Sequence, residues 1–167
     1  MFNKIGKIFM KKSSDKKHDL FISTITRILD MQIILIKDKI KSRSQLNTPY
    51  CRGYIFGCCE ELLILYDLAK DGIGTEELCD ILTVYIEIFG DIDGPIICGT
   101  ATHESEESYL LTTLLVKNEE NLTPNRTPDV NSIEEFAKGR VKGSKDIFNY
   151  FIDKERKFPF GLYDFFQ

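Results

Sequence analysis

The chain has 167 residues, of which 43% are hydrophobic and 29% are charged, and its formal net charge at pH 7 is -4. A chain of this length and composition buries enough apolar surface to fold as one domain, which excludes a wholly disordered protein. No apolar run approaches the roughly 20 residues that a transmembrane helix needs, so we predict no transmembrane segment.

The five cysteines predict a reducing compartment, and we therefore expect a cytoplasmic protein. Their number is odd, and no pair has the C-x-x-C spacing of zinc or thiol redox sites. Cys58 and Cys59 are adjacent within an apolar run, where a free thiol behaves as a small hydrophobic side chain. A redox-sensitive thiol pair is the alternative.

The first eighteen residues carry six lysines and one acidic residue, Asp15. We expect residues 1–18 to form a basic, flexible lead and residues 19–167 to form the folded domain. Within the lead, Lys7 interrupts the apolar run that a signal peptide would need. The apolar residues around it have the spacing of one helical face: Phe2, Ile5, Ile8 and Phe9.

The partner of the lead stays open at this stage, because six lysines suit nucleic acid, an anionic membrane or a solvated terminus. Residues 19–167 carry sixteen cations and twenty-five anions. Such an acidic domain repels phosphates, so we predict no nucleic-acid partner for the domain.

Apolar residues recurring every three or four positions predict a first helix from about Leu20 to Lys41. The stripe comprises Phe21, Ile22, Ile25, Ile28, Leu29, Ile33, Ile36 and Ile40. The β-branched run from Gln32 to Ile36 would also suit a strand, but Asp30, Gln32 and Lys37 fit the polar face of a helix.

A second helix is predicted from Tyr50 to Ala69, after the turn signal Asn47-Thr48-Pro49. Its apolar residues cover so much of the circumference that we expect it to be the central helix. Gly53 and Gly57 lie four residues apart on one face. Each glycine costs about 1 kcal/mol within a helix, so we expect another backbone to approach closely there.

A third helix is predicted to begin at Thr75 as its N-cap and to stop at Gly90. We expect a buried stripe at Leu78, Ile81, Leu82, Tyr85, Ile88 and Phe89. The outward face is predicted to carry Glu76, Glu77, Asp80 and Glu87.

The segment from Asp91 to His103 contains two glycines and Pro95, so we expect a loop. A fourth helix is predicted near Glu104, with Tyr109, Leu110, Leu114 and Leu115 inward. Lys117 to Asn131 is predicted to be a long polar connection.

Ser132 and Glu135 have the spacing of a capping box, which predicts the start of a fifth helix. Gly139 and Gly143 within it again lie four residues apart, as in the second helix, and we expect the two helices to cross at their glycines. The aromatic end from Phe158 to Phe166 is predicted to dock on its own domain. The sequence therefore predicts an all-α, compact single-domain bundle of about five helices with irregular loops.

No candidate motif for a metal or a cofactor has the residue spacing that such a site requires, so we predict no cofactor and no metal site. Reading Asp67 to Leu78 as a calcium loop places Leu78 where a bidentate glutamate is required. No glycine-rich phosphate loop is present. An enzymatic alternative would use a buried carboxylate and a Cys–His pair, and its residues are Glu60, Glu61, Cys98 and His103.

The segment from Asp67 to Glu107 carries eleven carboxylates and one cation, Lys70. A dense field of one sign speeds association with an oppositely charged partner, so we predict a non-catalytic module that binds a basic protein. Solubilising surface charge is the alternative interpretation. The predicted contact residues are Asp71, Glu76, Glu77, Asp80, Asp91 and Asp93.

In its acidic character, though not in any motif, the chain resembles bacterial immunity proteins, which occlude basic toxins or enzymes. The resemblance implies an antitoxin-type role. A second hypothesis is an oligomeric regulatory or scaffold protein that forms a homodimer or larger assembly through the aromatic end.

Overall fold

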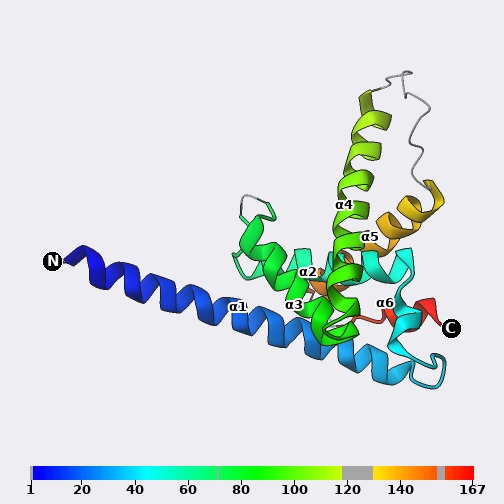
Figure 1. Ribbon diagram of the computed structural model, residues 1–167, viewed down its shortest axis with the longest axis horizontal. Helices are drawn as coiled ribbons and strands as arrows, with labels where there is room; N and C mark the ends of the chain where they lie inside the picture. The colour runs from blue at the N-terminus through cyan, green and yellow to red at the C-terminus, as the bar shows by residue number, and fades with distance from the viewer. Residues whose placement is uncertain (1, 71, 118–129, 154–156) are drawn as a thin grey trace.

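The computed structural model describes residues 2–70, 72–117, 130–153 and 157–167, with the backbone alone at 2–15, 111–117 and 130. The described residues contain six α-helices, one short 3-10 helix and no strand (Figure 1). The predicted all-α fold is confirmed. The predicted connection from Lys117 to Asn131 lies almost wholly outside the described residues.

Helix α1 (Phe2–Leu35) begins far before the predicted Leu20 and ends before the predicted Lys41. No break in the helix marks residue 18, and the N-terminal part projects away from the other helices (Figure 1). The predicted apolar stripe is buried except at Ile22 and Ile40, which are partly buried. Phe21, Ile25, Leu29 and Ile36 are fully inaccessible to solvent. A turn and the 3-10 helix η1 (Arg43–Leu46) lead to the next helix.

Helix α2 (Pro49–Leu65) is the central element, as predicted, and every residue from Cys51 to Cys59 is buried. The Thr48 hydroxyl caps its start by accepting the Cys51 N–H at 3.2 Å. Such a helix, apolar around most of its circumference, is typical of a core position.

Helix α5 (Val130–Ile152) crosses α2 at the glycines, which confirms the predicted crossing. A Cβ atom added at Gly57 would lie 2.0 Å from the Arg140 carbonyl oxygen, and one at Gly139 would lie 2.0 Å from the Tyr50 carbonyl oxygen. Only hydrogen at these positions lets the two backbones meet. The predicted helix start at Ser132 is wrong, because α5 already includes Val130. The Ser132 hydroxyl donates to Glu104 rather than capping the helix.

Helix α3 (Thr75–Phe89) has the predicted length, but its N-cap is Gly74, whose N–H donates to Glu77 Oε2 at 2.8 Å. Thr75 is therefore the first helical residue rather than the cap. Gly90 ends the helix as predicted, at a positive φ of 89° that suits glycine.

Helix α4 (Asp93–Lys117) replaces most of the predicted loop from Asp91 to His103. Pro95 stands in its first turn, where a missing N–H breaks no helical hydrogen bond. Tyr109 and Leu110, predicted to face inward, are 71% and 53% exposed. The upper part of α4 rises away from the other helices (Figure 1).

The aromatic end docks on its own chain, as predicted, through the short helix α6 (Gly161–Phe165). Leu162 is fully buried. Backbone donors fix the segment to a buried polar cluster: the Leu162 N–H donates to Gln32 Oε1 at 3.1 Å, and the Gly161 N–H donates to Asp146 Oδ2 at 3.1 Å. The Tyr54 hydroxyl also donates to Asp146, at 3.0 Å.

Candidate functional site

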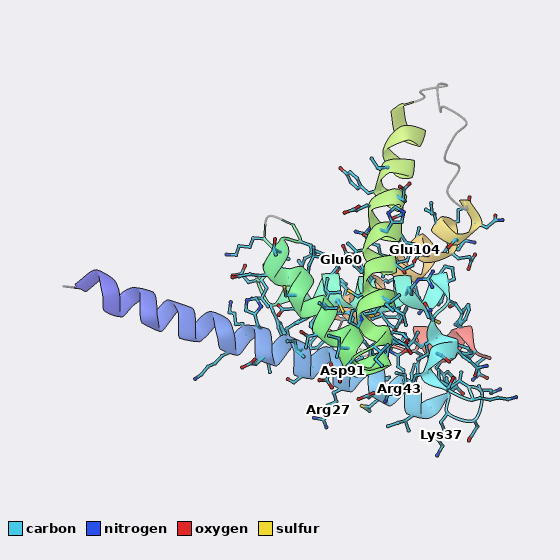
Figure 2. The ribbon with its side chains drawn as sticks, in the orientation of Figure 1. Arg27, Lys37, Arg43, Glu60, Asp91 and Glu104 are labelled. Carbon is cyan, nitrogen blue, oxygen red and sulfur yellow. The ribbon has the colours of Figure 1, made fainter. Side chains whose placement is uncertain are left out.

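The predicted acidic contact residues do not form one cluster. Glu76 is exposed and Glu77 half-buried at the N-terminal end of α3. Asp93 and Asp91, of which Figure 2 labels Asp91, are exposed beyond its C-terminal end. A helix of 15 residues is about 22 Å long, so the two groups are separated by that length. Asp71 lies outside the described residues.

Asp80, predicted on the outward face of α3, is 8% exposed and pairs with His18 of α1. The hydrogen bond to Asp80 raises the pKa of His18, with smaller contributions from Glu76 and Glu77. Burial raises the pKa of Asp80 itself, although His18 opposes that shift. The pair fastens α1 to α3 and leaves Asp80 little surface for an outside partner.

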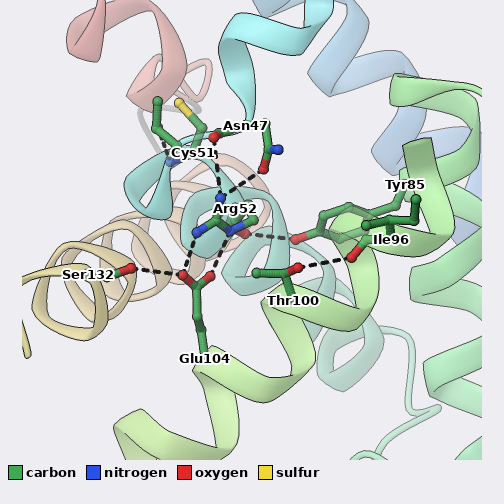
Figure 3. Close-up of polar contacts among 9 residues, drawn as sticks. Asn47, Cys51, Arg52, Tyr85, Ile96, Thr100, Glu104 and Ser132 are labelled. Atoms are coloured by element: carbon green, nitrogen blue, oxygen red, sulfur yellow. Dashed lines mark hydrogen bonds and ion pairs between the residues drawn. The ribbon is translucent and has the colours of Figure 1, made fainter. Parts of the chain in front are cut away.

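A second carboxylate of the acidic run, Glu104, is also used inside the fold. Arg52 of α2 holds it with two guanidinium hydrogen bonds, of which the Nε–Oε2 bond measures 2.7 Å (Figure 3). Ser132 of α5 donates to the same carboxylate at 3.1 Å, and Asn47 accepts from Arg52 at 2.8 Å. The ion pair therefore joins α2, α4 and α5 and is a structural contact.

A concave surface runs between α2, α4 and α5 and reaches the α2–α3 loop and the start of α3. It consists of two adjoining hollows of about 410 Å³ and 620 Å³ that share Glu60, Ile64, Tyr109 and Arg140. We call the pair the α2–α4–α5 groove. Its further lining residues are Phe56, Glu61, Ala69, Gly72, Ile73, Leu78, Thr102, Ser105, Glu106, Ser108, Ala137, Val141, Ser144, Lys145 and Phe148.

The groove is mostly apolar, and several of its large side chains are open to solvent. Ile64 is 57% exposed, Val141 69% and Phe148 46%. Glu106 is exposed at one side. Glu77, in the first turn of α3, lines a neighbouring hollow that shares Gly72 and Ile73 with the groove.

An ion pair crosses the floor of the groove. Arg140 of α5 donates two hydrogen bonds to Glu60 of α2, at 2.5 and 2.6 Å, and its guanidinium lies 5.8 Å from the centre of the Phe56 ring. The adjacent Glu61 accepts from the Ser144 hydroxyl at 2.6 Å. Both carboxylates thus have partners within the fold.

Two residues of the enzymatic alternative, Cys98 and His103, stand in different environments on α4. Cys98 is 5% exposed, and burial raises the pKa of its thiol, which disfavours the nucleophilic thiolate. His103 is exposed. Burial also raises the pKa of Cys58 and Cys59 well above the usual range, which fits their interpretation as small hydrophobic residues.

Within the described residues, no three His, Cys, Asp or Glu side chains are grouped closely enough to hold a metal ion. No helix there has both the length and the apolar character to cross a membrane.

Sequence reasoning missed the groove because its residues come from four helices and the loop between α2 and α3. In the sequence, Ile64 is one more apolar residue of an apolar helix, and the spacing of Tyr109 predicts a core position. Neither residue is therefore recognisable as exposed. The relative packing of α2, α4 and α5 decides which apolar residues stay open, and single-helix periodicity carries no signal for it.

Comparison of the chain with protein-family models, with curated proteins and with solved structures gives no match.

Proposed function

We propose that this chain is a non-catalytic protein-binding module of the immunity or antitoxin type, and that it binds a basic protein through the α2–α4–α5 groove. The observation that carries the proposal is the groove itself, an apolar surface lined by helices from distant parts of the sequence. Exposed apolar side chains gathered in a concavity are typical of binding sites.

The charges around the groove indicate the chemistry of the partner. Arg140 is neutralised by Glu60, and the exposed Lys145 adds positive charge to one of the two hollows, whereas Glu106 and the neighbouring Glu77 add negative charge to the other. A partner segment with apolar side chains flanked by lysine or arginine complements this surface. The proposal keeps Glu76 and Glu77 as contacts and moves the interface away from Asp91 and Asp93.

The test compares two exposed isoleucines, one inside the groove and one remote from it. Ile64→Asp places a negative charge in the groove. Ile92→Asp places the same charge at the α3–α4 turn, outside the groove, where Ile92 is 82% exposed. Both sites are open, so we expect both variants to fold. Extracts of the source cells are passed over immobilised unmodified chain and over each variant.

We expect one basic protein to be retained by the unmodified chain and by I92D but lost with I64D. That protein's own activity is then measured with and without equimolar chain, and we expect inhibition. Equal retention by I64D would contradict the groove, and an unchanged activity would contradict occlusion. Charge reversal by E76K/E77K should slow association more than D91K/D93K does.

A further inference from the structure

The side of α1 opposite the face packed on the body carries uncovered apolar side chains. Leu20 is 55% exposed, Met31 46% and Ile34 62%. Successive helical residues turn by about 100°, so these three positions share one arc about 60° wide. We call this side of the helix, over residues 16–34, the outer face of α1.

Two hollows flank the outer face, and both are lined in part by Ser23, Arg27 and Met31. One, of about 540 Å³, extends to the exposed Glu87 of α3. The other, of about 610 Å³, extends to the aromatic end of α5 and to Phe158 of the C-terminal segment. The outer face is thus a ridge between two depressions, and ridges and grooves of this kind are the surfaces through which helices pack.

Two opposite charges on the outer face are left over by the fold. Asp19 and Arg27 are both exposed, and in the described part of the chain neither forms an ion pair. They stand on one arc about 80° wide, with Ser23 midway between them. Eight residues separate the two, which places them about 12 Å apart along the helix axis. At that distance they do not pair within one chain.

A second copy in the antiparallel direction brings these charges together. With a two-fold axis at Ser23, a residue four positions before the axis lies level with the residue four positions after it in the other copy. Asp19 of each copy therefore meets Arg27 of the other, which gives two symmetric ion pairs. A parallel pairing in register would place Asp19 against Asp19 and Arg27 against Arg27 instead.

The remaining charges of the outer face obey the same symmetry. Lys16 and Asp30 lie seven positions on either side of the axis, so each meets its opposite in the other copy, although Asp30 also pairs with Arg43 at 3.0 Å. Ser23 is small enough for the axis, and its hydroxyl donates to the Leu20 carbonyl oxygen at 3.1 Å. The N-terminal parts of the two helices, which project from the body (Figure 1), leave in opposite directions.

We propose that the outer face of α1 binds the outer face of a second copy, antiparallel and about a two-fold axis at Ser23. Leu20 and Met31 of each copy then pack over the hollows that flank the helix of the other. The interface is centred on α1 rather than on the aromatic end. It is also independent of the α2–α4–α5 groove, because no residue of α1 lines that groove.

The test is a charge exchange followed by sedimentation equilibrium of the full chain over a range of concentrations. We expect a monomer–dimer equilibrium for the unmodified chain. Asp19→Arg or Arg27→Asp alone should raise the dimer dissociation constant roughly tenfold or more, because each removes two ion pairs and creates two repulsions. The double exchange D19R/R27D restores opposite charges across the axis and should bring the dissociation constant back to within about threefold of the original.

The matched control is Asp91→Arg, the same charge reversal at an exposed site away from α1, which should dimerise as the unmodified chain does. L20Q/M31Q should weaken the dimer without touching its charges. All of these side chains are exposed, and circular dichroism checks that each variant is folded. A monomer at every concentration, a dimer that the single reversals leave unchanged, or a double exchange that fails to restore it would overturn the proposal.

Discussion

At the scale of single residues, four glycines set the distance between the two helices at the centre of the molecule. Gly53 and Gly57 of α2 face the backbone of α5, while Gly139 and Gly143 of α5 face the backbone of α2. The spacing in the sequence was enough to predict this crossing. The entropy cost of helical glycine makes it informative, because a close backbone contact is needed to offset it.

Gly57→Ala should therefore destabilise the protein. The added methyl would lie 2.0 Å from the Arg140 carbonyl oxygen, and such overpacking costs about 1–3 kcal/mol. Gly99 of α4 is the matched control, since a methyl there meets nothing within 4 Å. Gly99→Ala should gain up to about 1 kcal/mol from helix propensity. Urea unfolding followed by circular dichroism measures both, and equal stabilities would refute the steric argument.

Two polar residues show where reasoning from the sequence fails at this scale. Gln32 and Asp80 were assigned to solvent-facing positions, yet both are buried. Their partners stand far away in the chain: Gln32 donates to Tyr54 at 3.2 Å, and Asp80 pairs with His18. A polar side chain is tolerated in the core when a residue far away in the sequence provides its hydrogen bond. The periodicity of its own helix does not reveal that partner.

At the scale of elements, the helical type of each element was predictable, whereas the starts of α1, α4 and α5 were not. Gly94, Pro95 and Gly99 indicated a loop, but proline is tolerated in a first turn. A Cβ atom at Gly94 would lie 2.6 Å from the Ile86 Cα, so this glycine serves the contact between α3 and α4. Glycine, which often ends a helix or marks a loop, also permits close packing between helices. The sequence alone does not distinguish these two uses.

The junction of α1 with α3 should depend on pH through His18. Its pKa is raised by Asp80, so the folded protein binds this proton more tightly than the unfolded chain does. That stabilisation is complete below the ordinary histidine pKa of 6.5 and is lost as the pH rises through the raised pKa. The free energy of unfolding should therefore fall as the pH rises from about 6.5 through the raised pKa of His18.

Proton NMR of the His18 ring measures the pKa directly, and Asp80→Asn should lower it and flatten the pH dependence. The raised pKa of Asp80 acts in the same direction at lower pH, because burial favours its neutral form. Asp91→Asn, at the far end of α3, should leave the titration of His18 unchanged. A pKa for His18 at or below 6.5 in the unmodified chain would contradict the pairing.

At the scale of the whole molecule, the C-terminal segment closes the core, as the sequence predicted from its aromatic residues. The sequence did not reveal the polar cluster beneath it, where Gln32, Tyr54 and Asp146 receive the segment's backbone donors. The candidate site was predictable only in part. The sequence showed the carboxylates beside the α2–α4–α5 groove, but the groove itself depends on how the helices from α2 to α5 are placed relative to one another.

Leu162→Ala should cost about 2–5 kcal/mol, because the side chain is fully buried and its removal leaves a cavity. Phe160→Ala is the control: that ring is 41% exposed, and its loss should cost at most about 1.5 kcal/mol. Thermal and urea unfolding give the stabilities, and sedimentation gives the mass. An L162A protein of normal stability whose mass falls from oligomer to monomer would instead support the scaffold hypothesis.

The α2–α5 crossing also has a consequence for biosynthesis. Cys58 of α2 and its contact Gly143 of α5 are 85 residues apart. At translation rates of about 5–20 residues per second, α2 leaves the ribosome roughly 4–17 seconds before α5 can cover it. During that interval the nascent chain exposes an apolar helix with two adjacent thiols. This uncovered helix is then open to binding by a chaperone.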